Sequence, residues 1–374
     1  MKKTNYRFWL FVLCSFLMSI YTFVYYKSQT ESEKIFSGSG VAQRTMLSSY
    51  FDGIKNTVMD TEVFILQGNE PGGTAVILGG THPNEPAGYI TAVMLVEGCT
   101  VLKGKVIVVP RANMAAFGWT DPLEGSPDKF YVDMPQGKKR VFRFGSRATN
   151  TSIQWPDPVL YYKGGNQVLN GAEARNLNRA YPGSPDGNPT EKLAYAIMEL
   201  IRKENADLAI DLHEASPEYT TVNALVAHQK AIDIAAEAVM YMEMDGLNIS
   251  LEQSPKNLSG LSHREWGDNS QTMPFLLEAS NPSQGRLRGR TDSDLIVYGK
   301  DKYYFKAEKA GRLNAPYDEN GAPLDLRVAR HLTAVNYIVQ AYSSNFSERE
   351  VIFNFLPSYE DIMQKGIGSY LLQQ

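Results

Sequence analysis

The fold is decided by one stretch, TAVILGGTHPNEPAG, which runs from Thr74 to Gly88. Its apolar first third, residues 74–78, predicts a buried strand, and the amphipathic stretch Tyr89–Glu97 that follows predicts a helix. His82 and Glu85 therefore lie three residues apart in a strand-to-helix turn, on one side of a single turn. An imidazole and a carboxylate together suit zinc better than magnesium or calcium, which prefer oxygen ligands. The stretch thus predicts two of the three protein ligands of a catalytic metal site.

Outward from this stretch, apolar strands alternate with helices. We expect strands at Thr61–Leu66, Thr74–Leu78, Lys105–Pro110, Leu208–Leu212, Val222–Ala227 and Pro274–Leu277, and helices at Tyr89–Glu97, Thr190–Glu204, Ala231–Met244 and Leu326–Tyr342. Thr190 is the expected cap of its helix. The alternation predicts an α/β fold with a mostly parallel or mixed central sheet flanked by helices.

Two segments interrupt this alternation, and the first of them shows no sustained period. Asp121–Asn170 is crowded with proline, glycine, aspartate and aromatic residues, and Arg286–Asp325 is polar and rich in turn residues. We expect the first to be a loop region without regular structure. A loop this long is either a lid or substrate wall, or a surface insertion with little role.

Composition narrows the class of protein. The 374 residues are 43% hydrophobic and 21% charged, with a formal net charge of -4, which is typical of a globular protein. We expect no nucleic-acid partner, because no basic stripe is interleaved with aromatic residues. The two cysteines, Cys14 and Cys99, exclude a disulfide framework and a cysteine-rich zinc site.

The N-terminus predicts a membrane anchor. Lys2, Lys3 and Arg7 precede the uncharged stretch Phe8–Tyr26, which is close to the roughly 20 residues that cross a bilayer as a helix. The basic flank predicts a cytoplasmic N-terminus, which places the rest of the chain outside the cytoplasm. A cleaved secretory signal is the alternative, and the body would then be secreted or periplasmic.

Polar side chains follow three of the predicted strands at their carboxyl ends, where ligands bind in open α/β sheets. His82 and Glu85 follow the first, His213 follows Leu208–Leu212, and Glu278 ends an apolar strand. Two histidines and a carboxylate meet the requirement of a hydrolytic zinc site, with one position left for a water of lowered pKa. Glu278 is then placed to take a proton from that water and pass it to a leaving amine.

Four motifs, in this order and at wide spacing, resemble the succinylglutamate desuccinylase/aspartoacylase family of the zinc carboxypeptidase-like superfamily. They are GTHPNE at 80–85, NLNRAYPG at 176–183, DLHE at 211–214 and Glu278 at the end of its strand. The resemblance covers roughly Thr61 to Glu278. It implies a zinc-carboxypeptidase-like fold with one zinc ion per chain.

The resemblance also implies roles for six of the motif residues. The implied metal ligands are His82, Glu85 and His213; the implied general base and acid is Glu278; and the residues implied to hold a substrate carboxylate are Asn178 and Arg179.

Two positions depart from the family pattern. Asn176 stands where the family usually has an aspartate that would orient a ligand histidine, although an amide can still accept a hydrogen bond there. Gly171 stands where the family tends to carry a second arginine. The candidates to replace that arginine from a loop are Arg143, Arg147 and Arg175.

These patterns predict three parts and one function. We expect a signal anchor or transmembrane segment at 1–27, a linker at 28–45 and a zinc-hydrolase domain at 46–374. The expected protein is an extracytoplasmic, membrane-anchored zinc hydrolase that cleaves an amide bond of an N-acyl amino acid or small peptide with a free carboxylate. A zinc esterase and a non-catalytic ligand-binding module on the same fold are the alternatives.

Overall fold

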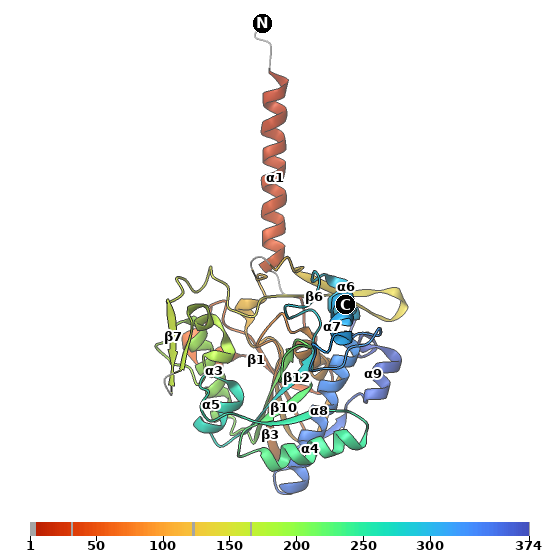
Figure 1. The fold of residues 1–374 in the computed structure, drawn as a ribbon. Helices are drawn as coiled ribbons and strands as arrows, with labels where there is room; N and C mark the ends of the chain where they lie inside the picture. The colour runs from red at the N-terminus through yellow and green to blue at the C-terminus, as the bar shows by residue number, and fades with distance from the viewer. Residues whose placement is uncertain (1–4, 31–32, 122–123, 165–166, 374) are drawn as a thin grey trace.

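The computed structural model describes residues 5–30, 33–121, 124–164 and 167–373 (Figure 1). The helices are α1 (Tyr6–Thr30), α2 (Pro86–Gly98), α3 (Pro189–Lys203), α4 (Ile232–Met244), α5 (Ser262–Asn269), α6 (Ser293–Tyr298), α7 (Lys302–Lys309), α8 (Leu324–Asn345) and α9 (Tyr359–Lys365). The strands are β1 (Val41–Met46), β2 (Glu62–Gln67), β3 (Glu70–Leu78), β4 (Thr100–Val109), β5 (Lys129–Asp133), β6 (Lys139–Arg143), β7 (Leu160–Lys163), β8 (Gln167–Asn170), β9 (Leu208–Ala215), β10 (Ala224–Ala227), β11 (Ser250–Gln253), β12 (Met273–Ser280) and β13 (Ile352–Phe355).

A mixed sheet organises the fold. In the described residues it has nine strands, in the order β1-β2-β4-β3-β9-β12-β10-β11, with β13 paired to β4. The central pairs β3–β4, β3–β9 and β9–β12 are parallel, whereas β2 and β10 join them in the antiparallel sense. This confirms the predicted α/β fold with a mixed central sheet flanked by helices.

Helices cover both faces of this sheet (Figure 1). Ile77 and Ile210 point to the face covered by α2, α4 and α8, while Val76 and Ala209 point to the face covered by α3 and α5. Because both faces of the central strands are buried, those strands read as continuous apolar runs rather than as alternating ones.

The same alternation gives the candidate residues their side of the sheet. Leu212 and Leu277 pack on the α2–α8 face, so His213 and Glu278, each one residue further on, face the side of α3 and α5. The parallel register of β9 and β12 sets His213 directly beside Glu278.

Two glycines allow the tight turn between β3 and α2. Gly80 has a φ of +68°, a left-handed conformation that a side chain disfavours. A Cβ on Gly88 would lie 2.3 Å from the backbone oxygen of Leu212, so the glycine lets α2 approach β9 closely. The helix begins at Pro86, three residues before the predicted start, because proline suits the first helical position.

The prediction of a loop region without regular structure was wrong for parts of Asp121–Asn170. Within Asp121–Asn170, β5 pairs with β6 and β7 with β8 as short hairpins. Their strands are four or five residues long, too short to show a sustained period. Within Arg286–Asp325, Asp292 and Asp301 cap the short helices α6 and α7.

The cap of α3 is also different from the predicted one. Asn188, not Thr190, accepts the backbone N–H of Glu191, and the Glu191 side chain accepts the N–H of Asn188 in return. Pro189 is consequently the first helical residue. Thr190 instead donates its hydroxyl to Gln154 from inside the helix.

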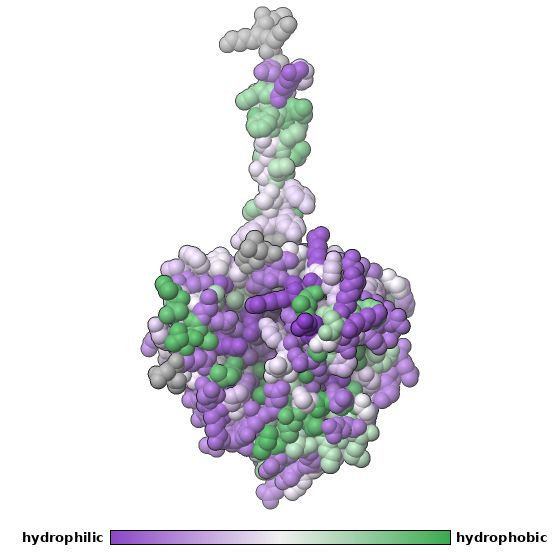
Figure 2. Space-filling view, viewed as in Figure 1, coloured by the Kyte–Doolittle hydropathy of each residue, from purple (hydrophilic) through white to green (hydrophobic). Residues whose placement is uncertain are grey.

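The helix α1 stands away from the body (Figure 1). Among the described residues, its segment Tyr6–Ser28 alone has the length and hydropathy to cross a membrane, and it is not buried. Figure 2 shows hydrophobic side chains around its outer half. The chain that leaves it is tied to the body, because the N–H of Phe36 donates to Glu97 and Arg140 donates to the oxygen of Lys34.

Candidate metal centre

Three buried side chains meet at the carboxyl ends of β3 and β9. His82 and Glu85 come from the turn between β3 and α2, and His213 comes from β9. His82 Nδ1 lies 2.8 Å from Glu85 Oε1, and His213 Nδ1 lies 2.9 Å from Glu85 Oε2. One ligand atom of each residue lies within 4.8 Å of the others, so a single cation can contact all three.

The hydrogen bonds around His82 decide which ring nitrogen carries the proton. Asn176 donates its Nδ2 to Glu173 at 2.7 Å, so its Oδ1 faces the ring and accepts from His82 Nε2 at 2.8 Å. Burial lowers the pKa of His82 to about 4, so the ring is neutral and its Nδ1 bears a lone pair. That lone pair faces a carboxylate oxygen of Glu85 at 2.8 Å. Two acceptors this close are stabilised by a cation between them, and the two imidazoles and one carboxylate fit zinc.

His213 has a charged partner on its other nitrogen. Asp211 Oδ2 lies 2.9 Å from His213 Nε2, and Thr81 donates its hydroxyl to Asp211 Oδ1 at 2.7 Å. Burial would lower the pKa of His213, but Asp211 and Glu85 hold it well above its usual value. Burial would likewise raise the pKa of Glu85, but the two imidazoles hold it well below its usual range. Glu85 is therefore ionised, as a ligand must be, and metal binding would displace a proton from His213.

Glu278 lies beside this cluster, next to His213 in the sheet register. The residue is half-buried, and its Oε2 is buried without a hydrogen-bond partner among the described residues. Burial raises the pKa of Glu278 to about 8, and the negative charge of Glu85 acts in the same direction. A carboxyl group with that pKa can take up and release a proton near neutral pH.

Asn178 and Arg179 lie in a short 3₁₀ turn, Leu177–Arg179, that faces the start of α5. Asn178 Oδ1 accepts the backbone N–H of Ser262 at 2.8 Å, so this amide holds α5 in place. The Arg179 side chain is 25% exposed, and its closest carboxylate oxygen, on Glu173, is 3.8 Å away. Burial lowers the pKa of Arg179, whereas the negative charges of Glu173, Glu278 and Glu85 act in the opposite direction.

The three candidate arginines have different surroundings. Arg175 is bound by both carboxylate oxygens of Asp157, at 2.7 and 3.0 Å, and is structural. Arg143 donates to the backbone oxygen of Ser28 near the end of α1. Arg147 is the one of the three that reaches the cluster: its Nη1 lies 3.4 Å from His82 Nδ1 and 3.5 Å from Glu85 Oε1.

The segment that carries Arg147 is fixed against the metal-ligand turn. The N–H of Gly145 donates to the oxygen of Pro83, and the N–H of Ser146 donates to Ala116. A Cβ on Gly145 would lie 2.6 Å from the ring of Pro83, so only glycine allows this approach. The Arg147 N–H and the Ser146 hydroxyl both donate to Asp121. The Arg147 side chain stays 40% exposed, which leaves it accessible to a ligand.

Sequence reasoning assigned no role to Asp211 or Glu173. A signal for Asp211 was present, because strand residues two apart share a face and Asp211 precedes His213 by two. Glu173 had no such signal, because its contact with Asn176 depends on an irregular turn. Glu214 points to the opposite face and pairs with Arg327, while its backbone N–H donates to Glu85.

The mixed sheet and the carboxyl-end cluster define the class of protein, a mixed α/β fold with a buried His–Glu–His cluster at the carboxyl ends of its strands. Within it, residues 163–284 match the model of the succinylglutamate desuccinylase/aspartoacylase catalytic domain. This match agrees with the resemblance read from the motifs, over that segment of the chain. The matched residues include His213 and Glu278 but not His82 and Glu85. No protein of curated function matches the chain.

Several solved structures are similar to parts of the chain. A succinylglutamate desuccinylase from Silicibacter sp. TM1040 is 22% identical with a TM-score of 0.37 over 59% of this chain and 54% of its own. The product-bound ectoine utilization protein EutE (DoeB) from Ruegeria pomeroyi is 17% identical with a TM-score of 0.37 over 75% and 61%. The tripeptide-bound cell shape determinant Csd4 from Helicobacter pylori is 13% identical with a TM-score of 0.45 over 81% and 59%. The chain thus spans less than two thirds of the length of each.

Proposed function

We propose that this protein is a membrane-anchored, extracytoplasmic zinc hydrolase. It cleaves the amide bond of an N-acyl amino acid or a small peptide with a free carboxylate. The observation that carries the proposal is the buried His82–Glu85–His213 cluster, in which a histidine lone pair faces a carboxylate oxygen at 2.8 Å beside Glu278. His82, Glu85 and His213 would hold one zinc ion. When bound, zinc acidifies water and polarises a carbonyl group.

Glu278 is the proton carrier of this proposal. Its carboxylate accepts a proton from the attacking water, and its carboxyl group then gives that proton to the leaving amine. Burial keeps its pKa close to the working range, so both steps are accessible at one pH. Among the described residues the Oε2 of Glu278 has no hydrogen-bond partner, which supports the role, because a carboxylate oxygen in a structural contact would have a donor.

Two arginines divide the substrate contacts. Arg179, a partly buried cation with no carboxylate closer than 3.8 Å among the described residues, pairs with the carboxylate of the substrate. Asn178 orients that arginine, because its backbone oxygen accepts a hydrogen bond from Nη1 of Arg179 at 2.6 Å. Arg147, held beside the cluster by its anchored loop, stabilises the negative charge that develops on the carbonyl oxygen. Arg147 would take the place of the second arginine that the family tends to carry where this chain has Gly171.

The anchor positions this chemistry outside the cytoplasm. We propose a transmembrane segment at 1–27, a linker at 28–45 whose last residues add the edge strand β1, and a catalytic domain at 46–374. The uncharged span with its basic N-terminal flank supports this topology. Cell fractionation tests it: full-length protein in the cytosolic fraction contradicts it, and a shorter soluble exported form shows a cleaved signal instead.

A hydrolysis assay tests the function. Full-length protein in detergent is offered N-acyl amino acids and dipeptides, with and without 1,10-phenanthroline. We expect amide hydrolysis that the chelator abolishes and added zinc restores. Binding without turnover contradicts catalysis and indicates a ligand-binding module. Turnover of the matching esters but not of the amides indicates a zinc esterase.

A further inference from the structure

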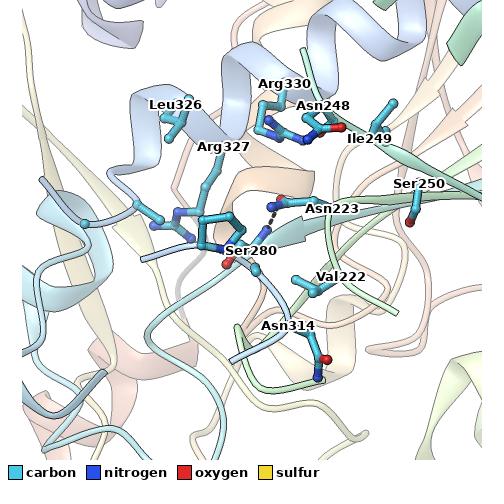
Figure 3. Close-up of a pocket in the computed structure, with 14 residues that line it drawn as sticks. Val222, Asn223, Asn248, Ile249, Ser250, Ser280, Asn314, Leu326, Arg327 and Arg330 are labelled. Carbon is cyan, nitrogen blue, oxygen red and sulfur yellow. Dashed lines mark hydrogen bonds between the residues drawn. The ribbon is translucent and has the colours of Figure 1, made fainter. Parts of the chain in front are cut away.

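A cavity of about 350 Å³ opens where α8 meets the ends of β10, β11 and β12. Figure 3 shows Arg327 and Arg330 of α8 on one side of it and Asn223 and Ser280 below them. Two further amides line it, those of Asn248 and Asn314. Among the described residues no aspartate or glutamate lines the cavity. Its charged groups are therefore two guanidinium groups, which favours an anionic ligand.

The two arginines differ in how far their charge is compensated. Arg327 is 1% exposed, and its Nη1 pairs with Glu214 Oε1 at 2.6 Å. Arg330 donates its Nη2 to the backbone oxygen of Asn248. In the part of the chain that the structure describes, no carboxylate oxygen lies within 4.0 Å of the Arg330 nitrogens. The cavity thus has one uncompensated positive charge, and burial lowers the pKa of Arg330 without neutralising it.

One hydroxyl on the opposite wall, that of Ser280, has no hydrogen-bond partner among the described residues. Ser280 is 6% exposed, and its Oγ is buried. Asn223, at a φ of +48°, accepts the N–H of Ser280 on its Oδ1 at 3.0 Å, the contact dashed in Figure 3. This fixes the amide with Nδ2 left as a donor. Buried polar groups are normally paired, so a hydroxyl without a partner at a cavity wall points to a ligand.

We propose that this cavity binds a small monocarboxylate that also carries an amide group, with the carboxylate on Arg330. One uncompensated guanidinium matches one negative charge, and its planar fork matches a carboxylate. The amides and hydroxyl of the opposite wall match an amide group of the ligand. The volume falls in the range of small-molecule sites. Neither the three candidate metal ligands nor Glu278 lines the cavity, so this site is separate from the candidate metal centre and does not rest on the proposed function.

Calorimetric titration with N-acetylglycine tests the proposal. Full-length protein in detergent is used, with a chelator present to stop metal-dependent turnover. Binding should persist in Arg179→Ala, which alters the candidate metal centre, and weaken at least tenfold in Arg330→Ala. Arg330→Lys should bind with intermediate affinity, because it keeps the charge but loses the fork. Inorganic phosphate should bind more weakly than N-acetylglycine.

Further measurements separate a lost site from a lost fold. The thermal unfolding midpoint of Arg330→Ala should stay near that of the wild type, and Ser280→Ala provides a second, smaller change that should also weaken binding. Amide hydrolysis by the zinc-loaded protein should be unaffected by Arg330→Ala. Binding that is unchanged in both cavity variants, or lost in Arg179→Ala, overturns the proposal. No detectable binding to the wild type, or tighter binding of phosphate, overturns it as well.

Discussion

Oδ1 of Asn176 lies 2.8 Å from Nε2 of His82, in the position where a carboxylate oxygen would orient the ring. The amide oxygen accepts a hydrogen bond from the N–H of Nε2. This fixes the tautomer of the ring and leaves the lone pair of Nδ1 to bind a metal. The amide does so without a negative charge. Nδ2 of the same amide donates to Glu173 at 2.7 Å. The negative charge of Glu173 therefore acts on the ring through the amide of Asn176 and not by direct contact. The pair Asn176–Glu173 thus performs the orientation that an aspartate alone would perform.

This relationship predicts an unusual mutation pattern. Asn176→Asp alone should improve zinc affinity little, because the new carboxylate would face Glu173 across the present 2.7 Å contact. The double variant Asn176→Asp/Glu173→Gln restores a donor and should tighten zinc binding by about tenfold. Competition with a chromophoric chelator measures both affinities. A single variant that binds as tightly as the double one would show that Glu173 does not oppose the aspartate.

The ligand assignment predicts metal loss. His82→Ala and His213→Ala should each reduce the zinc content of the purified protein from about one ion per chain to well below that, because two ligands do not hold the ion. His228→Ala is the matched control, since His228 is as buried but pairs with Asp268. Elemental analysis decides, and unchanged zinc in either ligand variant refutes the site.

Glu278→Gln separates proton transfer from metal binding. The amide keeps the shape of the side chain but cannot take a proton, so kcat should fall by about 10²-fold or more while KM changes little. Zinc content and folding should be nearly unchanged, because the ligand set is intact. Normal turnover would exclude Glu278 as the proton carrier, and loss of zinc would identify it as a ligand.

Arg147 and Arg179 should have distinct kinetic signatures. Arg147→Ala should lower kcat by about 10²-fold with a smaller change in KM, because the guanidinium acts on charge that forms in the transition state. Arg179→Ala should mainly raise KM, because it pairs with a carboxylate present throughout the reaction. Arg175→Ala is no suitable control, since that side chain holds Asp157. Arg286→Ala offers a surface control, and identical profiles for Arg147→Ala and Arg179→Ala would contradict the division of roles.

The raised pKa of Glu278 predicts a pH-dependent stability difference in metal-free protein. The folded state binds the proton of Glu278 more tightly than the unfolded state does, since burial raises its pKa from 4.5 to about 8. The stabilisation that the Glu278 proton gives to the folded state is complete below about pH 4.5 and is lost as the pH rises through 8. Glu278→Gln should therefore match the wild type at pH 5 and be more stable at pH 9, by on the order of a few kcal/mol. Thermal unfolding at both pH values checks the sign, and saturation with zinc should reduce the difference.

The family motifs and the strand runs could be read from the sequence because they are local. Buried parallel strands need continuous apolar runs, and their carboxyl ends meet at one sheet edge, so His82, Glu85, His213 and Glu278 could be expected together before any contact was known. The short hairpins within Asp121–Asn170 were missed because four or five residues are too few to establish a period.

Only the tertiary structure chose among the arginines. The sequence around Arg143, Arg147 and Arg175 does not distinguish them, because their roles depend on which side chains lie beside them in the fold. Arg175 is taken by Asp157, whereas Arg147 reaches His82 because Gly145 packs on Pro83. The hydrogen bond between Asn176 and Glu173 and the cavity beneath Arg330 likewise depend on the tertiary structure. The sequence by itself determined the fold class and the residues of the candidate centre, since those depend on periodicity and strand ends. The tertiary structure decided which charges are compensated, because compensation depends on distances between segments that no local pattern encodes.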